Sequence, residues 1–498
     1  MKYISTRGDS SPITSAQAIL TGLAPDGGLF LPESNPVLAP EELTSFLELD
    51  YQLTAEKILK LYLTDYLPGE LGKMLSLAYG EKFDTPEVTP LTIFQDNLAF
   101  LELWHGPTCA FKDLALQLLP YLLTSAARKT GFEKEIVLLV ATSGDTGKAA
   151  LEGFKNVPGT KVIVFYPEDG VSKVQKQQMV TQEGENTFVI GVRGNFDQAQ
   201  TGVKTIFSDC SLQKEMEQAG KSFSSANSIN WGRLVPQLVY YFRAWSGLIK
   251  KGKLKPQESF NIVVPTGNFG NILAAYYGKK MGLPVHKLIC ASNSNNVLTD
   301  FIRTGVYDRK RSFYQTISPS MDILVSSNLE RLLYDLTGHN PQAVTDYMEK
   351  LRVEGSYRLI PQQLAILKET FWAGYVTEKE TTRAIKEVFE KFNYLIDPHT
   401  AVGYKVFKDY IEETGDGRPT VIAATASPFK FNAGVARAVL GDKSTLDQDE
   451  FSLLRELSNL TGVKVPQGLL GLEEKPVLHQ KVVNPEEMEG TVREILGI

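Results

Sequence analysis

Continuous apolar runs recur along this chain, and each is followed by a turn and an amphipathic segment. EIVLLVA, from Glu135 to Ala141, is the clearest run, and KVIVFY (161–166), FNIVV (260–264) and TVIAA (420–424) repeat the pattern. A run without polar alternation is typical of a strand that is buried on both faces. Since strands that alternate with helices join into parallel sheets with helices on both faces, the sequence predicts an α/β fold.

The alternating pattern covers only part of the 498 residues. It starts near residue 98, and the apolar spacing from Tyr51 to Tyr66 predicts a helix in a separate N-terminal unit. Charged helical patterns, from Leu329 to Leu336 and from Glu378 to Phe392, interrupt it later. We therefore expect an N-terminal unit (1–97), an α/β domain (98–225), a large α/β domain made of two segments (226–295 and 396–498) and a helical insertion (296–395).

Charge and cysteine content exclude several classes of function. The chain has 52 basic and 58 acidic residues, a net charge of −6 and no long basic run, so nucleic acid is not an expected partner. Three cysteines without a C-x-x-C pair favour a reducing compartment and give no support for a metal site. No stretch approaches the roughly 18 apolar residues of a membrane span, and the first residues do not match a signal peptide. We expect a cytoplasmic protein without a membrane partner.

Lys112 is the first candidate for chemistry. It lies in WHGPTCAFKD (104–113), between a predicted strand from Leu98 to Trp104 and a predicted helix from Leu114 to Thr130. Desolvation at such a junction lowers the pKa of a lysine, and the neutral amine attacks an aldehyde. The local sequence by itself favours a surface lysine that pairs with Asp113, because such a lysine near a helix start is common.

Two glycine-rich turns each join a predicted buried strand to a predicted helix. In TSGDTG (142–147), the hydroxyls of Ser143 and Thr146 and the backbone N–H groups can face an anion at the positive end of the helix dipole, whereas Asp145 would repel it. In TGNFGN (266–271), several N–H groups can converge on a phosphate. Both segments can also be ordinary turns with a helix cap. Neither has the full spacing of a P-loop or of a dinucleotide-binding turn.

Three further stretches contain residues that can bind a ligand. Arg233 in NSINWGR (227–233) can bind phosphate or carboxylate through two hydrogen bonds, or can be a surface residue at a helix start. Thr425 follows a predicted strand, where α/β folds bind ligands, but a lone threonine there is normally a helix cap. His399 in DPHTAVG (397–403) is more often a structural, hydrogen-bonded residue than a catalyst.

These motifs together, in this order, resemble the pyridoxal-phosphate-dependent threonine synthases, especially the longer form of bacteria and fungi. The N-terminal GLAPDGGLFLP (22–32) fits the same family, and the resemblance covers residues 1 to about 435. It implies pyridoxal-phosphate fold type II, the fold of the tryptophan synthase β subunit. That fold has parallel-sheet domains with helices on both faces, here with an N-terminal unit and a helical insertion.

The resemblance also implies a role for each motif. Lys112 would be the Schiff-base lysine and the catalytic base. The implied cofactor contacts are Gly267, Asn268, Phe269, Gly270 and Asn271 at the phosphate, and Thr425 at the pyridine nitrogen. The implied substrate contacts are Ser143, Gly144, Asp145, Thr146 and Gly147 at the amino-acid end, and Ser228, Asn230 and Arg233 at the phosphate. The chain departs from the family pattern at Ser427, which stands where a histidine is often found, and at Cys109, where an aliphatic residue is more usual.

The implied reaction converts O-phospho-L-homoserine and water to L-threonine and phosphate, by γ-elimination followed by β-addition of water. The implied protein is a monomer or a homodimer. Two alternatives stay open from the sequence. One is a serine or threonine dehydratase-like lyase of the same fold, which needs no second phosphate site. The other is a protein of this fold that binds a phosphorylated ligand without catalysis and has no use for Lys112.

Overall fold

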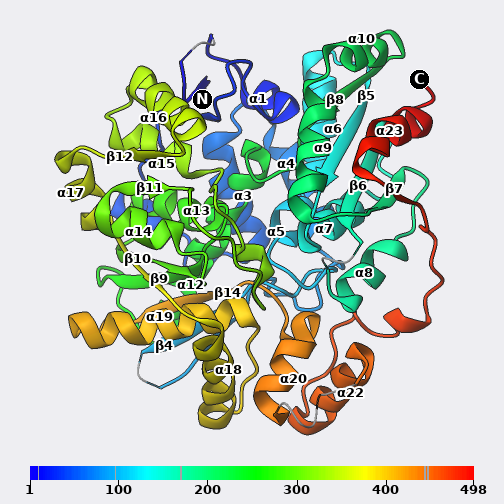
Figure 1. Ribbon diagram of the computed structural model, residues 1–498. Helices are drawn as coiled ribbons and strands as arrows, with labels where there is room; N and C mark the ends of the chain where they lie inside the picture. Colours follow the sequence, from blue (N-terminus) through cyan, green and yellow to red (C-terminus); the bar gives the residue numbers. More distant parts are fainter. Residues whose placement is uncertain (9–10, 96, 169–170, 442–444, 446–447) are drawn as a thin grey trace.

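The computed structural model describes residues 1–8, 11–95, 97–168, 171–441, 445 and 448–498, and it contains two sheets of largely parallel strands (Figure 1). The larger sheet has the strand order β13-β10-β9-β14-β4-β3, and only its edge pair β3–β4 is antiparallel. Its strands are β3 (Leu91–Ile93), β4 (Leu98–Glu102), β9 (Phe260–Pro265), β10 (Val285–Ser292), β13 (Phe371–Tyr375) and β14 (Thr420–Ala424).

The smaller sheet has the order β15-β7-β6-β5-β8, and all of its pairs are parallel. Its strands are β5 (Glu135–Ala141), β6 (Thr160–Pro167), β7 (Thr187–Val192), β8 (Lys221–Ser224) and β15 (Val482–Val483). Its helices are α7 (Asp145–Phe154), α8 (Lys173–Val180), α9 (Phe196–Ser208), α10 (Cys210–Gln218) and α23 (Met488–Leu496).

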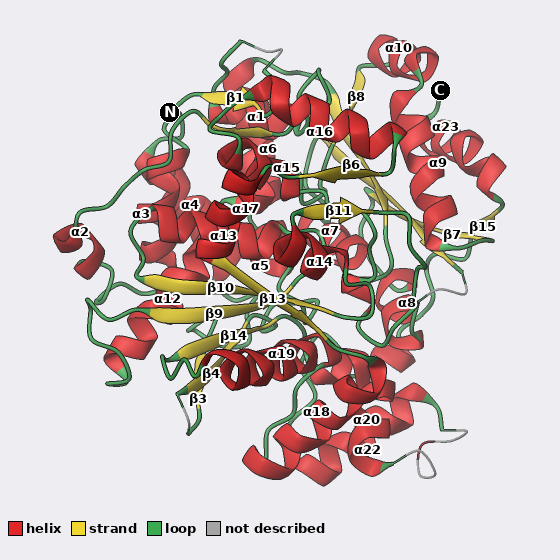
Figure 2. Cartoon of the chain, turned by 60° about the vertical axis from the view of Figure 1, so that its left-hand side comes forward, coloured by secondary structure: helices red, strands yellow, loops and turns green. Residues whose placement is uncertain are grey.

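Both sheets are buried on both faces, as the continuous apolar runs predict. In β9, Ile262 and Val264 join one core with α12 (Gln237–Lys250) and α13 (Gly270–Lys280), whereas Val263 joins another with α19 (Pro398–Thr414). Successive side chains of a strand point to opposite faces, so an uninterrupted apolar run serves both cores. Figure 2 shows α19 lying along one face of the larger sheet, where it contacts four of its strands.

The remaining elements belong to the N-terminal unit, to the segment 296–395 and to the part of the chain after β14. The N-terminal unit has the antiparallel pair β1 (Tyr3–Ser5) and β2 (Phe30–Pro32), with α1 (Ser15–Thr21), α2 (Pro40–Thr44), α3 (Tyr51–Tyr62) and α4 (Pro68–Tyr79). The segment 296–395 has α14 (Val297–Thr304), α15 (Leu329–Leu336), α16 (Pro341–Val353), α17 (Pro361–Thr370) and α18 (Glu378–Phe392), with the pair β11 (Val306–Asp308) and β12 (Ser356–Arg358). After β14 come α20 (Asn432–Leu440) and α22 (Glu450–Thr461).

Strand pairing crosses the expected boundaries between parts of the chain in three places. β4 lies in the expected 98–225 domain but pairs with β14 in the larger sheet. β13 lies in the expected helical insertion but pairs with β10 as an edge strand of the same sheet. β15 lies in the expected large domain but pairs with β7 in the smaller sheet. Pairing joins segments that are distant in sequence, and local periodicity contains no information about the partner.

Several predicted elements are confirmed at their boundaries, including β5, β14, α15 and α18. The predicted helix from Leu114 to Thr130 is wrong as one helix, because the chain forms α5 (Asp113–Leu116) and then α6 (Leu119–Thr130). Pro120, in the first turn of α6, has no N–H to donate to the Leu116 carbonyl oxygen, and its ring would clash with that oxygen in a continuous helix, which explains the break. In the part of the chain that the structure describes, no helix has the length and apolarity needed to span a membrane.

Candidate functional site

Lys112 lies in a loop between the carboxyl ends of two neighbouring strands of the larger sheet. The loop follows β4 and pairs with the segment that follows β14, with an antiparallel bridge between Ala110 and Ala426. The Phe111 N–H donates to the Thr425 carbonyl oxygen at 2.8 Å. In α/β folds, ligands bind at the carboxyl ends of the parallel strands. The fold therefore brings Lys112 and Thr425, two predicted site residues, together at the ligand-binding edge of the sheet.

Asp113 anchors this loop from inside. Its carboxylate is fully buried and accepts hydrogen bonds from the N–H and the hydroxyl of Thr108, both at 2.8 Å. Burial raises the pKa of Asp113 to about 6, although the hydrogen bonds from Thr108 oppose the shift. The alternative of a surface ion pair between Lys112 and Asp113 is therefore wrong, because the carboxylate turns inward to Thr108.

The Lys112 amine points instead toward a cluster of polar side chains. Its Nζ lies 3.3 Å from Ser320 Oγ and 3.5 Å from Asp145 Oδ2, and its side chain is 12% exposed. Burial lowers the pKa of Lys112, and the positive charges of Lys430 and Arg233 add to this, while Asp145 opposes it. A lowered pKa favours the neutral amine, which can react with a carbonyl group and can take up a proton.

Asp145 is a buried carboxylate whose charge is matched by the side chains of two lysines. Its Oδ1 lies 2.9 Å from Lys430 Nζ and accepts a hydrogen bond from Gln175 Nε2 at 3.0 Å, and its Oδ2 accepts one from Ser320 Oγ at 3.0 Å. Burial favours the neutral acid, but Lys430 and Lys112 together hold the pKa of Asp145 below its usual range. The repulsion of an anion that the sequence suggested is thus offset by two lysines.

In the 142–147 turn, two of the backbone N–H groups that were predicted to face a ligand are bonded within the turn. Thr142 Oγ1 accepts hydrogen bonds from the N–H groups of Gly144, at 3.0 Å, and Gly147, at 2.9 Å. These two N–H groups therefore do not face a ligand, which corrects the predicted substrate contacts of Gly144 and Gly147 through their amides. The hydroxyls of Ser143 and Thr146 make no hydrogen bond to any residue that the structure describes, so they remain available.

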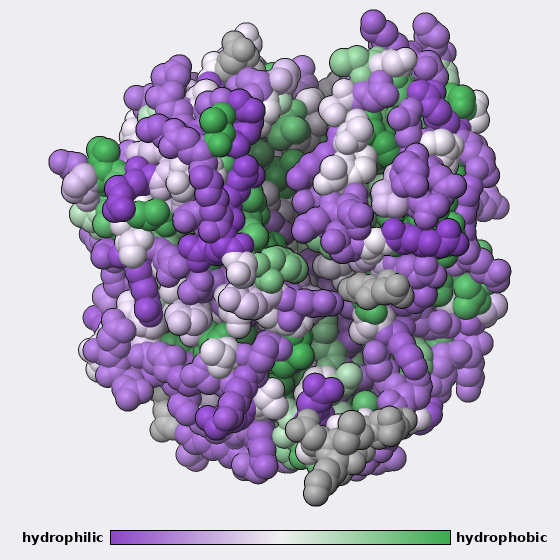
Figure 3. All heavy atoms as spheres, in the orientation of Figure 1, coloured by the Kyte–Doolittle hydropathy of each residue, from purple (hydrophilic) through white to green (hydrophobic). Residues whose placement is uncertain are grey.

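The site lies between the units built on the two sheets. Asp145 begins α7 of the smaller-sheet unit, whereas the Lys112 loop belongs to the larger sheet. In the space-filling view a cleft runs between these units (Figure 3). A ligand bound at Lys112 therefore lies where both units can contact it.

The 266–271 turn follows β9 and opens α13. Phe269 adopts the left-handed conformation with φ 62°, so the chain turns sharply before the first helical residue, Gly270. A Cβ at Gly267 would lie 2.6 Å from the Ser320 carbonyl oxygen, so only glycine fits there. Asn271 Oδ1 accepts hydrogen bonds from the hydroxyls of Tyr240 and Tyr241, while its buried Nδ2 has no partner among the described residues. The turn thus offers an unpaired donor beside a helix N-terminus, which suits an anion.

Asn328, just before α15, links the two segments that were predicted to bind anions. Its Nδ2 donates to the Asn268 carbonyl oxygen at 3.0 Å and to Ser228 Oγ at 3.1 Å. Arg331 donates in turn to Asn328 Oδ1, at 2.6 Å, and to the carbonyl oxygens of Phe30 and Ile229. The 267–271 turn and the 227–233 segment are therefore neighbours in space.

Within the 227–233 segment, the side chain of Asn230 is fully hydrogen-bonded, whereas that of Arg233 is not. Asn230 is fully buried, and its side chain bonds the carbonyl oxygens of Ile19 and Ser225 and the N–H of Gly232. The predicted phosphate contact of Asn230 is therefore wrong in this structure, because both ends of its amide are occupied. Arg233 is 2% exposed, donates from Nη1 to the Ala226 carbonyl oxygen and has an unpaired Nε. Burial lowers its pKa to about 10, and no acidic residue in the described structure pairs with it.

Sequence reasoning missed three residues of this cluster. Lys430 is within TASPFKF, and its Nζ donates to the Thr108 carbonyl oxygen at 2.8 Å as well as binding Asp145. Ser320 and Asn328 come from the 296–395 segment, where no local motif marked them. His399 is structural, as expected: its Nδ1 lies 2.6 Å from Asp397 Oδ2, and its Nε2 accepts from the Ser320 N–H at 3.1 Å.

Comparison with known proteins identifies the family. Residues 2–79 match the family model of the threonine synthase N terminus, residues 87–426 that of pyridoxal-phosphate dependent enzymes, and residues 400–489 that of the threonine synthase C-terminal part. The threonine synthase of Pseudomonas aeruginosa is 39% identical over 447 residues, which are 90% of this chain and 92% of that protein. The chain belongs to the threonine synthase family. The family resemblance of the motifs is thereby confirmed.

A solved structure supports the same family and fold. The crystal structure of pyridoxal-phosphate-bound threonine synthase from Brucella melitensis superposes with a TM-score of 0.88 at 35% identity, and the alignment covers 100% of both chains. The α/β fold of type II is thereby confirmed. Threonine synthase-like 1 of Homo sapiens is 40% identical over 434 residues, which are 85% of this chain. The chain spans 58% of the length of that relative.

Proposed function

We propose that this chain converts O-phospho-L-homoserine and water to L-threonine and phosphate, with pyridoxal 5′-phosphate as its cofactor. One observation carries the proposal: a buried lysine amine lies near two neighbouring groups of unpaired donors, those of the 267–271 turn and that of Arg233. The reaction needs two such groups, because both the cofactor and the substrate carry a phosphate. We propose a cytoplasmic location and a monomer or homodimer that needs neither nucleic acid nor membrane.

The residues of the site fit the cofactor. Lys112 would hold it covalently through Nζ, and the 267–271 turn would hold its phosphate beside the unpaired Asn271 Nδ2. The Thr425 hydroxyl would meet the pyridine nitrogen at the end of β14. When bound, pyridoxal phosphate supplies the electron sink that makes loss of the substrate's Cα proton possible.

The substrate would be held at its two ends. The hydroxyls of Ser143 and Thr146 are free to receive its amino-acid end, and Arg233 and Ser228 lie where its phosphate can be bound. The Arg233 guanidinium is buried with one carbonyl partner and an unpaired Nε, so its charge is stabilised when an anion joins it. Arg233 therefore favours an anionic substrate group, with charge-assisted hydrogen bonds to the phosphate.

Lys112 would be the base that removes the Cα proton, since burial and the positive charges of Lys430 and Arg233 lower its pKa. Asp145 and Ser320 would position the Lys112 amine, at 3.5 Å and 3.3 Å from Nζ. Lys430 keeps Asp145 charged, so the carboxylate holds Lys112 in place without taking its proton. Loss of a Cβ proton would allow the γ-phosphate to leave, and the OH of water would then add at Cβ. Return of protons to Cα and Cγ would complete the reaction.

Product analysis tests the proposal against a dehydratase-like lyase of the same fold. The purified protein with pyridoxal phosphate should release phosphate and L-threonine in equal amounts from O-phospho-L-homoserine. It should form little ketobutyrate from threonine or pyruvate from serine. The opposite preference would overturn the proposed function and favour the dehydratase, which has no need of Arg233.

The close approach at Gly267 makes a prediction about cofactor binding. Gly267→Ala should weaken the affinity for pyridoxal phosphate by about tenfold or more, because overpacking of this kind costs about 1–3 kcal/mol. Titration of the apoprotein with pyridoxal phosphate measures the effect. Gly270→Ala is the matched control, since its Cβ would lie 3.4 Å from Asn328 Nδ2 and should cause a smaller loss. Equal affinities for the two variants would contradict the role of the turn.

A further inference from the structure

A cavity lies beside the loop that carries Lys112, outside the site described above. It has a volume of about 290 Å³ and is bordered by the 105–107 segment, by α7 and α8 of the smaller-sheet unit, and by the 466–475 segment near the carboxyl end of the chain. The polar residues that line it and carry the argument are Lys82, His105, Lys148, Lys155, Gln178 and Lys475. The volume is sufficient for a small metabolite.

Gln178, in α8, lines this cavity with an amide that has no partner. The residue is 1% exposed, and neither its Nε2 nor its Oε1 makes a hydrogen bond within the described part of the chain. A buried amide without partners loses the hydrogen bonds that water gives it in the unfolded chain, at both its N–H and its oxygen. Native proteins rarely accept that cost twice in one side chain unless a ligand or a water satisfies the amide.

The charges that line the cavity leave two lysines unmatched. Lys148 pairs with Glu152 at 2.9 Å, and Lys155 pairs with Glu183 at 2.7 Å. Lys82 donates to the side-chain oxygens of Gln117 and Tyr121 and lies over the Tyr121 ring. Among the described residues, neither Lys82 nor Lys475 has an acidic residue within ion-pair distance. The cavity therefore has positive charge to spare for an anionic ligand.

His105 also lines the cavity, and two carboxylates hold its ring in place. Its Nδ1 lies 2.6 Å from Asp84 and its Nε2 lies 2.8 Å from Glu102. Burial opposes the charged form, but these two hydrogen bonds raise the pKa of His105 to about 9. The two carboxylates together exceed the single charge of the imidazolium, so the spare positive charge of the cavity rests on Lys82 and Lys475.

We propose that this cavity binds a small organic dianion, either a phosphate monoester or a dicarboxylate. Lys82 and Lys475 would bind its charged groups, and the Gln178 amide would donate to and accept from a polar group of the ligand. The position of the cavity couples such a ligand to the active site. α7 begins with Asp145, which faces Lys112, and a Cβ on Gly468 would overlap the Pro107 carbonyl oxygen of the lysine loop.

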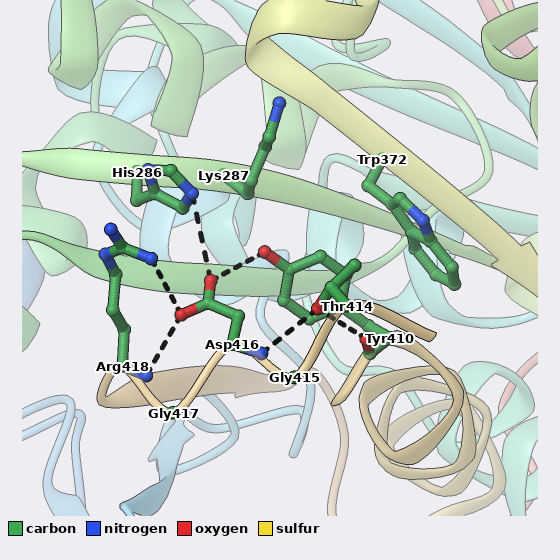
Figure 4. A pocket seen from close by; sticks show the side chains of 9 residues that line it. All are labelled: His286, Lys287, Trp372, Tyr410, Thr414, Gly415, Asp416, Gly417 and Arg418. Atoms are coloured by element: carbon green, nitrogen blue, oxygen red, sulfur yellow. Dashed lines mark hydrogen bonds and ion pairs between the residues drawn. The ribbon is translucent and has the colours of Figure 1, made fainter. Parts of the chain in front are cut away.

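A larger surface depression around Asp416, with a volume of about 610 Å³, differs from this cavity (Figure 4). The Asp416 carboxylate that lines the depression already has hydrogen-bond partners within the protein. Asp416 accepts hydrogen bonds from Tyr410 at 2.7 Å and from Arg418 at 2.8 Å, and Asn261 donates a further one at 3.0 Å. Its polar centre therefore has no unmet demand for a ligand, unlike Gln178 and Lys82.

Calorimetric titration of the full-length holoprotein tests the proposal, with sn-glycerol 3-phosphate and succinate as the two probes. We expect at least one probe to bind with a Kd of about 1 mM or tighter. Lys82→Met and Gln178→Leu should each weaken that binding about tenfold, whereas Arg233→Met should leave it unchanged. The probe that binds identifies the ligand as a phosphate monoester or as a dicarboxylate.

Two results would overturn the proposal. One is the absence of binding heat for both probes up to about 10 mM. The other is a loss of binding in Arg233→Met but not in Lys82→Met, which would place the probe in the active site. Lys82 is partly exposed, so its replacement leaves the core intact. Because the measurement needs no turnover, its outcome is independent of the proposed reaction.

Discussion

Lys112→Ala should lose turnover by at least about 10³-fold, because the same amine is proposed to hold the cofactor and to move the Cα proton. Its surroundings suit both tasks: the amine is buried, its pKa is lowered, and Ser320 and Asp145 hold it at 3.3 Å and 3.5 Å. Phosphate release from O-phospho-L-homoserine measures the loss. The variant should also lack a borohydride-reducible bond between the cofactor and the peptide that contains residue 112.

Lys279→Ala is a matched control for this variant. Burial also lowers the pKa of Lys279, but this residue lies in the last turn of α13, far along the helix from the 267–271 turn, and bonds the Val285 carbonyl oxygen. Its replacement should leave turnover within about twofold of the parent protein, as surface and half-buried substitutions away from a site commonly do. If Lys112→Ala retained more than a tenth of the parent activity, Lys112 would be neither the anchor nor the base.

Arg233→Met should raise the KM for O-phospho-L-homoserine by about 10- to 100-fold with a smaller change in kcat. A charge-assisted hydrogen bond to phosphate contributes about 1.5–3 kcal/mol, which corresponds to that range. The fold should tolerate the change, because it removes a buried cation that has no carboxylate partner in the described structure. Steady-state kinetics and thermal unfolding of the same preparation separate the two effects.

Arg331→Met provides the comparison. Arg331 is as deeply buried as Arg233, and burial likewise lowers its pKa to about 10, but its guanidinium bonds Asn328 and the carbonyl oxygens of Phe30 and Ile229. Its loss leaves these acceptors unpaired and should reduce the free energy of unfolding by about 3 kcal/mol. An unchanged KM in Arg233→Met, or equal destabilisation by the two substitutions, would contradict the assignment of Arg233 to the substrate phosphate.

The elements that sequence reasoning predicted best are those whose environment is uniform. β5 is buried on both faces, so its apolar run has no competing interpretation, and the prediction from Glu135 to Ala141 is confirmed at both ends. The helix predicted from Leu114 to Thr130 was wrong as one helix because apolar periodicity continues through residues 117–118, where Pro120 prevents α5 from continuing into α6. Periodicity reports which side chains are buried, whereas the break depends on a missing backbone donor.

The sequence by itself determined the fold class, the family and the motifs around Lys112, Gly267 and Thr425, because each of these depends on contiguous residues. Burial patterns, turns and helix starts are local properties of the chain. Only the tertiary structure decided that Lys430 and Ser320 join Lys112 and Asp145 in one cluster. It alone also showed that the Asn230 side chain is occupied by Ile19 and Ser225, whereas Arg233 keeps an unpaired Nε. Those assignments depend on which distant groups satisfy each buried charge or amide, and that is settled by packing between segments rather than by their sequence.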